Sequence, residues 1–232
     1  MQVKEALILA GGLGTRLREA VPDLPKCMAP VNGRPFISFV IRHLAKQGVE
    51  HFVFSLGYKS EAFLDFLSRE LPPGTYDIVI EETPLGTGGA IQYASRQCIE
   101  PFFVVVNGDS IFQIDLASLA DFHFSHKSCC TLALKPMENV DRYGSVETDP
   151  TGRISLFKEK QFFEKGLING GVYLINKAYL FEKELPEKFS FETDFLQKFY
   201  KEGSIFGIPQ AGYFIDIGIP EDYQRAQTEL TY

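Results

Sequence analysis

Several features that mark particular classes of protein are scarce or absent in this chain. It has only four cysteines (Cys27, Cys98, Cys129, Cys130), and their spacing fits neither a metal site nor a redox pair. It has no signal peptide and no apolar run long enough to span a bilayer, so we expect a cytoplasmic protein with free thiols and no membrane partner. Acidic residues outnumber basic ones by 30 to 23, and the formal net charge of −7 disfavours a nucleic-acid partner.

The composition that remains is that of an ordinary globular protein. Hydrophobic residues make up 45% of the chain and charged residues 23%, with no low-complexity tract. A chain of 232 residues can bury a substantial core, and we expect residues 1–232 to form a single domain. The acidity does not exclude a small phosphorylated substrate, because local basic residues and a bound divalent cation can reverse the field within one cleft.

Short apolar runs alternate with amphipathic stretches in the first half of the chain. The expected strands are 6–10, 51–55, 77–80 and 102–106, and the expected helices are 36–47, 61–69, 89–96 and 116–126. This alternation predicts right-handed βαβ units and an α/β, Rossmann-like fold with a mostly parallel central sheet flanked by helices. Ligands in such sheets bind beyond the carboxyl ends of the strands.

The second half has a different character and predicts a smaller, β-rich elaboration of that fold. Its expected strands are 131–134, 145–148, 154–157, 171–175 and 213–217, and its expected helices are 192–200 and 221–230. Turn signals such as DPTG at 149–152 separate the strands. No linker rich in proline or serine divides the two halves.

A glycine-rich loop, LAGGLGTRLR at residues 9–18, follows the apolar run ALILA. Glycine lets backbone N–H groups approach phosphates closely, although this loop matches neither the dinucleotide fingerprint nor the standard phosphate loop. Arg16 lies in the loop and Lys26 follows in DLPKCMAP, so the two cations can surround a polyphosphate. The alternative is that both are solvated surface residues, which for Lys26 alone is the better interpretation.

Two aspartates follow apolar strands at the positions where ligands bind. Asp109 ends VVVNGDS, and Asp216 lies in AGYFIDIGIPEDY. A carboxylate here can hold Mg²⁺, which takes one or two carboxylates together with substrate phosphate oxygens. Aspartate also commonly ends a strand as a turn residue, so either one alone is ambiguous. Together with the cations, the pair predicts a site for metal-assisted phosphoryl chemistry.

These stretches resemble, in order, the motifs of the sugar-1-phosphate nucleotidyltransferase family. The similarity rests on LAGGLGTRL with PKCMAP, EETPLGTGGA, NGDS, FKEK, LINGGVYL and FIDIGIPEDY, and it runs from about residue 3 to residue 225. Within the family, DRYGSV, KGLINGGVYL, EKFSFE and YFIDIGIPEDY are most similar to the D-glycero-α-D-manno-heptose 1-phosphate guanylyltransferases. Relatives that act on mannose or glucose phosphate share much of this pattern.

The resemblance implies a reaction and a set of site residues. A sugar 1-phosphate would attack the α-phosphorus of a nucleoside triphosphate, with Mg²⁺ as cofactor, and pyrophosphate would leave. Residues 1–128 would form the nucleotide-binding half and residues 129–232 the sugar-phosphate half. The catalytic residues would be Arg16, Lys26 and Asp109, and the metal ligands Asp109 and Asp216. The nucleotide would contact Leu9, Gly11, Gly12, Gly14, Thr15, Arg16, Glu81, Gly86 and Thr87. The sugar phosphate would contact Lys26, Gly144, Glu159, Lys160 and Asn169.

The base is expected to be read by Glu81, at the end of the strand before LGTGG. A carboxylate accepts hydrogen bonds and cannot donate them, so it suits the adjacent N1–H and N2–H donors of guanine better than the carbonyls of uracil. Glu81 therefore favours GTP over UTP, unless it points to solvent and backbone groups read the base.

Other interpretations stay open. A mannose, glucose or aminosugar 1-phosphate could be the acceptor, and UTP the donor. A regulatory protein that binds nucleotide sugars without turning them over is the alternative from another class. The β-rich elaboration and the last helix could build a homodimer. The four histidines form no acid–base or metal cluster, and we expect His123 and His126 on a helix surface.

Overall fold

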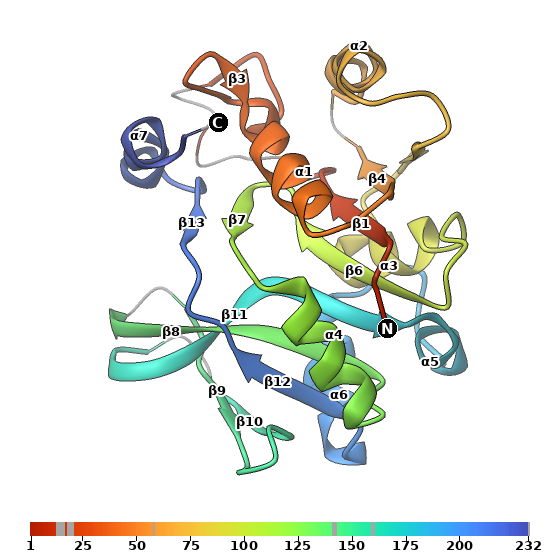
Figure 1. The fold of residues 1–232 in the computed structure, drawn as a ribbon, viewed down its shortest axis with the longest axis vertical. Coiled ribbons are helices and arrows are strands. Elements are labelled where there is room, and N and C mark those ends of the chain that lie inside the picture. The colour runs from red at the N-terminus through yellow and green to blue at the C-terminus, as the bar shows by residue number, and fades with distance from the viewer. Residues whose placement is uncertain (13–16, 18–20, 58, 141–142, 159–160, 232) are drawn as a thin grey trace.

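A twisted sheet of seven strands runs through the structure, with helices on both of its faces (Figure 1). This computed structural model describes residues 1–12, 17, 21–57, 59–140, 143–158 and 161–231. The strand order is β12-β8-β11-β6-β1-β4-β5. Neighbouring strands are parallel except where β11 pairs with β6 and with β8. The predicted α/β class with a mostly parallel sheet is confirmed.

The sheet combines strands from both halves of the chain. Its strands are β1 (Glu5–Leu9), β4 (His51–Leu56), β5 (Tyr76–Ile80), β6 (Phe102–Asn107), β8 (Cys130–Val140), β11 (Phe163–Asn176) and β12 (Ile205–Pro209). Three two-stranded ladders accompany it: β2 (Pro30–Val31) with β3 (Arg34–Pro35), β7 (Ser110–Phe112) with β13 (Phe214–Asp216), and β9 (Val146–Thr148) with β10 (Ile154–Phe157).

Helices and single turns connect the strands. The helices are α1 (Phe36–Lys46), α2 (Glu61–Glu70), α3 (Gly86–Ala94), α4 (Leu116–Ser125), α5 (Lys177–Glu182), α6 (Gln197–Phe199) and α7 (Pro220–Glu229). The shorter turns are η1 (Lys26–Met28), η2 (Phe191–Leu196, a turn of π-helix) and η3 (Tyr200–Glu202). None of the helices in the described part of the chain is long and apolar enough to cross a membrane.

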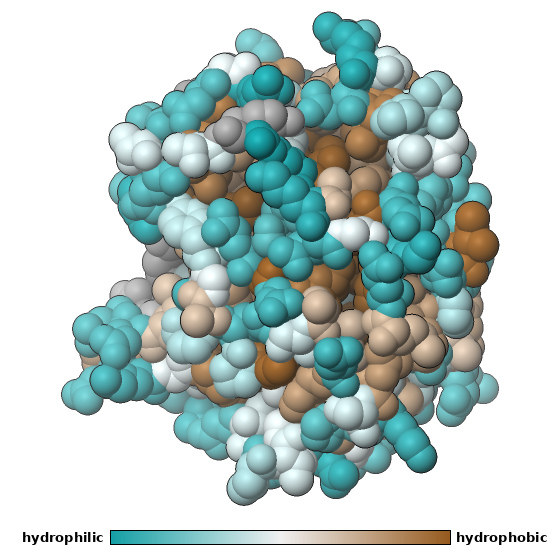
Figure 2. Space-filling view, in the orientation of Figure 1, coloured by the Kyte–Doolittle hydropathy of each residue, from teal (hydrophilic) through white to brown (hydrophobic). Residues whose placement is uncertain are grey.

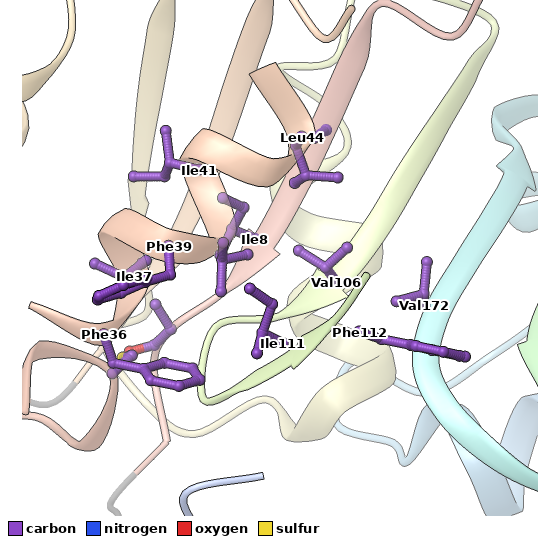
Figure 3. Close-up of a cluster of buried hydrophobic side chains, with 14 of the residues drawn as sticks. Ile8, Phe36, Ile37, Phe39, Ile41, Leu44, Val106, Ile111, Phe112 and Val172 are labelled. Carbon is purple, nitrogen blue, oxygen red and sulfur yellow. The ribbon is translucent and has the colours of Figure 1, made fainter. Parts of the chain in front are cut away.

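Two hydrophobic clusters cover the two faces of the sheet. Side chains alternate between the faces along a strand, so Ile8 of β1 packs in one cluster and its neighbour Leu7 in the other. The first cluster includes the apolar face of α1, seen over β1 and β6 in Figure 3, and the second includes α3 and α5. On the surface drawn in Figure 2, hydrophilic side chains predominate and apolar ones show between them. The sheet is buried by a hydrophobic cluster on each face, and it forms the rigid support for the loops at the ends of its strands.

The second half differs most from the sequence prediction. The expected strand 171–175 is the end of β11, whose 14 residues pair with the long β8, and β12 was not predicted at all. Gly207 and Pro209 lie within β12, and residues of these types seldom occur inside strands. The expected helix 192–200 consists of η2 followed by α6. In these segments, tertiary packing overrides local propensity.

His123 is a second correction, because it is buried and does not lie on a helix surface as predicted. It is 1% exposed, and its Nδ1 lies 2.8 Å from Thr131 Oγ1. Its Nε2 has no hydrogen-bond partner among the described residues. Burial lowers the pKa of His123 to about 4. His126, at the end of the same helix, is exposed as predicted.

His123 should make stability fall as the pH is lowered below neutrality. Between about pH 6.5 and pH 4 the unfolded chain binds a proton at this residue and the folded chain does not, so up to about 3 kcal/mol is lost across this window. Urea unfolding followed from pH 7.5 to pH 4.5 should show this slope, and His123→Phe should reduce it. His126→Phe is the matched control on the same helix. An equal slope in wild type and His123→Phe would contradict the assignment.

Candidate functional site

The carboxyl ends of β1 and β6 lie side by side and carry the two loops that begin the site. Leu9 is in register with Asn107, and the Gly108 N–H donates to the Leu9 carbonyl at 2.8 Å. The end of β4 joins them, because the Ala10 N–H donates to the Ser55 carbonyl at 2.8 Å. The first residues of the glycine-rich stretch, Leu9 and Ala10, and the NGDS segment are thereby held together at one edge of the sheet. Two clefts open at this edge.

The first cleft has a volume of about 590 Å³ and lies at the ends of β1, β4, β5 and β6, against the start of α3. Its lining comprises Leu9, Gly11, Gly12, Gly57, Glu81, Glu82, Pro84, Gly86, Thr87, Ala90, Asn107 and Asp109. The predicted nucleotide contacts that the structure describes all lie here. Gly14, Thr15 and Arg16 fall outside the described residues. The first cleft therefore brings together residues that are up to 100 positions apart in the chain.

The second cleft, of about 240 Å³, lies under the β-rich second half. Its lining comprises Asn107, Asp109, Ser110, Tyr143, Gly144, Ser145, Val146, Phe157, Lys158, Asn169, Gly170, Gly171, Glu192, Gln197, Phe214 and Asp216. Gly144 and Asn169, two predicted sugar-phosphate contacts, are among them, whereas Glu159 and Lys160 fall outside the described residues. Asn107 and Asp109 line both clefts. The two clefts thus adjoin at the end of β6.

Lys26 joins the two predicted metal ligands at this junction. Its Nζ lies 2.8 Å from Asp109 Oδ2 and 2.9 Å from Asp216 Oδ1. The β7–β13 ladder places Asp216 opposite Ser110, and the Gly218 N–H donates to Asp216 Oδ1 at 2.8 Å. Burial alone would lower the pKa of Lys26, but the charges of Asp109 and Asp216 outweigh it and raise the pKa. Lys26 is therefore a charged, partly buried group, and the surface interpretation is wrong.

The two aspartates suit a hard cation, since both carboxylates already converge on one cationic group. No cluster of three or more histidine, cysteine, aspartate or glutamate side chains with metal-binding geometry occurs among the described residues. A divalent ion held here would complete its coordination with ligands such as phosphate oxygens and water, as Mg²⁺ commonly does.

Glu81 lies where the first cleft meets the end of β5. Its Oε1 accepts a hydrogen bond from the Ser55 hydroxyl at 3.0 Å, and its Oε2 accepts one from the Leu85 N–H at 3.2 Å. A Cβ on Gly11 would lie 3.1 Å from Glu81 Oε1, so a glycine allows the first loop to pack closely against this carboxylate. Glu81 faces the cleft and does not simply point to bulk solvent.

The start of α3 is packed against residues 187–191. A Cβ on Gly88 would lie 2.1 Å from the Phe189 ring, and the Thr87 hydroxyl accepts the Phe191 N–H at 2.9 Å. The helix begins at Gly86, three residues before the predicted start, because this packing stabilises a glycine-rich turn with low helix propensity. Gly86 and Thr87 consequently present the first turn of α3 to the first cleft.

Gly86 should be intolerant of a side chain. Its φ is +72°, and a Cβ there would lie 2.6 Å from the Phe189 carbonyl oxygen. Gly86→Ala should cost roughly 3 kcal/mol of unfolding free energy. Gly74→Ala is the control, because Gly74 has a φ of +83° and open space around it. That variant should lose only about 1 kcal/mol in a urea titration. Equal losses of unfolding free energy in Gly86→Ala and Gly74→Ala would show that the contact with the Phe189 carbonyl adds no cost at Gly86.

Asn169, a predicted sugar-phosphate contact, lines the second cleft and is held there by hydrogen bonds to its neighbours. Its Nδ2 donates to Tyr173 Oη at 2.8 Å and to Glu192 Oε1 at 3.0 Å, and its Oδ1 accepts the Gly171 N–H at 3.1 Å. Both ends of the amide already have protein partners. Asn169 therefore fixes the position of the Glu192 carboxylate. The pairing of β11 with β8 changes register just after Asn169, at Gly170 and Gly171.

Sequence reasoning did not select several residues that line these clefts. They are Gly57, Glu82, Pro84 and Ala90 in the first cleft, Asn107 in both, and Ser110, Tyr143, Ser145, Val146, Phe157, Lys158, Gly170, Gly171, Glu192, Gln197 and Phe214 in the second. Asn107 and Ser110 flank Asp109 in NGDS and could have been included with it. Glu192 ends EKFSFE, one of the stretches that carry the family resemblance, and could have been selected from it. Nothing in the sequence distinguishes Gln197 from a surface residue, because α6 brings it to the cleft.

Known proteins are similar to this chain in sequence and in fold. The nucleotidyl transferase family model matches residues 5–232. The chain is 46% identical over 228 residues to the D-glycero-α-D-manno-heptose 1-phosphate guanylyltransferase of Aneurinibacillus thermoaerophilus, covering 98% of this chain and 99% of that protein. It is 43% identical to the enzyme of that name from Campylobacter jejuni, covering 94% and 96%. A crystal structure of HddC from Yersinia pseudotuberculosis complexed with GMP-PN has a TM-score of 0.87 and 36% identity, covering 99% of this chain and all of that one.

Proposed function

Because this chain belongs to the nucleotidyl transferase family, we propose that it transfers GMP from GTP to a sugar 1-phosphate, with D-glycero-α-D-manno-heptose 1-phosphate as the acceptor. The observation that carries the proposal is the junction of the two clefts at Asn107 and Asp109, beside Lys26. One cleft would hold the triphosphate and the other the sugar phosphate. The names of the two bacterial relatives and the GMP-PN complex of HddC support the choice of substrates.

The proposed reaction is a single displacement at phosphorus. An oxygen of the sugar phosphate forms a bond to the α-phosphorus of GTP, and the bond from that phosphorus to the α–β bridging oxygen breaks. Pyrophosphate leaves with the electron pair. Both reactants are anions, so the main tasks of the protein are positioning and charge neutralisation. Since the attacking phosphate is already ionised, no general base is required.

Lys26 is the described group best placed to neutralise charge at the junction. It can exchange a carboxylate partner for a phosphate oxygen without leaving its position between Asp109 and Asp216. Asp109 and Asp216 would hold Mg²⁺, which would neutralise charge on the triphosphate when bound. Arg16, in the glycine-rich stretch 9–18 of the sequence, is proposed to hold the departing pyrophosphate, and Glu159 and Lys160 to contact the sugar phosphate.

The setting and assembly of the enzyme are also proposals. We place it in the cytoplasm, which is consistent with a triphosphate substrate and with the four free cysteines. A homodimer built on the second half of the chain stays a prediction.

Pyrophosphate release tests the proposed function. Purified protein with Mg²⁺ should be assayed with each of GTP, UTP, ATP and CTP against a panel of sugar 1-phosphates that includes the heptose and mannose compounds. We expect release with GTP and D-glycero-α-D-manno-heptose 1-phosphate above all other pairs. A preference for mannose, glucose or aminosugar phosphate would overturn the acceptor, and a preference for UTP would overturn the base. No release with any pair would favour a protein that binds nucleotide sugars without turning them over.

A further inference from the structure

Ser55 is a buried polar residue that none of the proposed catalytic steps uses. It lies in β4, its relative exposure is 0%, and its hydroxyl donates to Glu81 Oε1 at 3.0 Å. Its carbonyl accepts the Ala10 N–H at 2.8 Å, and it is in register with Leu9 of β1 and Val79 of β5, so its backbone is fixed between these two strands. A buried hydroxyl held at this point is a rigid donor, because neither the strand nor the side chain has room to move.

The Glu81 carboxylate is held at both of its oxygens. Ser55 donates to Oε1, and the Leu85 N–H donates to Oε2 at 3.2 Å. The Glu81 N–H also donates to the Leu56 carbonyl at 2.8 Å, which ties the backbone of this residue to the end of β4. Since an ionised carboxyl oxygen can accept about two hydrogen bonds, each oxygen retains acceptor capacity for a ligand in the first cleft.

We propose that Ser55 is a positioning residue for base selection, acting through Glu81. The inference rests on the proposed use of GTP. Guanine has two adjacent donors, N1–H and N2–H, and a carboxylate receives both only when it is turned edge-on to the base. The hydroxyl of Ser55 and the N–H of Leu85 fix that rotation. The close approach of Gly11 to Oε1 limits it further. Preorganised acceptors discriminate between bases more strongly than mobile ones.

The ratio of kcat/KM for GTP to that for ITP reports the two-donor contact, because the hypoxanthine of ITP lacks the 2-amino group. We expect the wild-type protein to prefer GTP roughly tenfold or more. Ser55→Ala should reduce this preference to about twofold, with most of the loss in KM for GTP. Ser55→Thr, which restores a hydroxyl, should regain part of the preference.

Ser95→Ala is the matched control. Ser95 is also 0% exposed, and its hydroxyl donates to the Gln92 carbonyl at 3.0 Å at the C-terminal end of α3, away from Glu81 in the chain and outside the lining of both clefts as the described residues define them. A general loss of packing would affect both alanine variants alike, and it would lower the rates with GTP and ITP together. If Ser55→Ala does not fold, Ser55→Cys takes its place, since a thiol is a similar size and a weak donor.

The outcomes separate the two proposals. A wild-type enzyme that prefers UTP overturns the proposed use of GTP on which the inference rests. A wild-type enzyme that uses GTP and ITP equally, and both above UTP, leaves the use of GTP intact and overturns the two-donor contact through which Ser55 would act. A wild type with a strong preference for GTP over ITP that Ser55→Ala retains in full overturns the role of Ser55 alone. Loss of the preference in Ser55→Ala but not in Ser95→Ala supports the positioning role.

Discussion

Replacing Lys26 with alanine should lower kcat/KM for nucleotide-sugar formation by roughly 10²–10³-fold, the range found when one group that stabilises transition-state charge is removed. Its Nζ is within 2.9 Å of both Asp109 and Asp216, where the two clefts meet. Without this cation, two phosphates must approach each other beside two carboxylates. Initial rates of pyrophosphate release, with circular dichroism to verify folding, measure the effect.

Lys183 provides the control for this experiment. Its side chain is 12% exposed, as is that of Lys26, and its Nζ pairs with Glu202 at 2.6 Å. It does not line either cleft as the described residues define them. Lys183→Ala should therefore retain activity within about threefold, the effect of a modest local perturbation. Equal losses in the two variants, or a Lys26→Ala enzyme within tenfold of the wild type, would show that Lys26 has no special role.

Glu81→Gln should change which purine nucleotide the enzyme accepts. A glutamine offers one acceptor and a pair of donors, so it can no longer receive both N–H groups of guanine. Xanthine has N1–H beside a carbonyl at position 2, and this pattern matches a glutamine. We expect kcat/KM for GTP to fall roughly 10²-fold and that for XTP to rise above the wild-type value. Competition between GTP and XTP, followed by mass spectrometry of the products, measures the change directly.

The neighbouring carboxylate shows whether this effect belongs to Glu81. Glu82 lines the same cleft but is exposed. Glu82→Gln should leave the order of preference among GTP, XTP and UTP as in the wild type. An unchanged preference for GTP in Glu81→Gln, or an exchange of preference in Glu82→Gln, would remove Glu81 from base selection.

The parts of the fold that local pattern determines could be predicted from the sequence. Apolar runs such as FFVVVN are buried on both faces of a parallel sheet, and α1 has an apolar face with helical spacing. The position of Asp109 just after a strand could also be predicted, because the apolar run of β6 gives way to the polar residues of NGDS at that point. The two strand-end aspartates were grouped with Lys26 on the same reasoning, and the resemblance to a family supplied the role of each residue.

Contacts between distant segments could not be predicted in this way. Ser55 and Glu81 are 26 residues apart, and only the pairing of β4 with β5 brings their side chains together. Glu192 reaches the second cleft through a turn of π-helix, which has no local sequence signal. The burial of His123 is not evident from the sequence, because apolar residues occur on more than one side of α4 and periodicity does not show which face is buried.

The path of the phosphate oxygens tests the central claim, that an oxygen of the sugar phosphate attacks the α-phosphorus of GTP and displaces pyrophosphate. The acceptor, D-glycero-α-D-manno-heptose 1-phosphate, is labelled with oxygen-18 at the non-bridging oxygens of its phosphate and incubated with the enzyme, unlabelled GTP and Mg²⁺. Mass spectrometry should find all of the label in the nucleotide sugar and none in the pyrophosphate. Label in pyrophosphate, a nucleotide sugar without label, or no nucleotide sugar at all would contradict it.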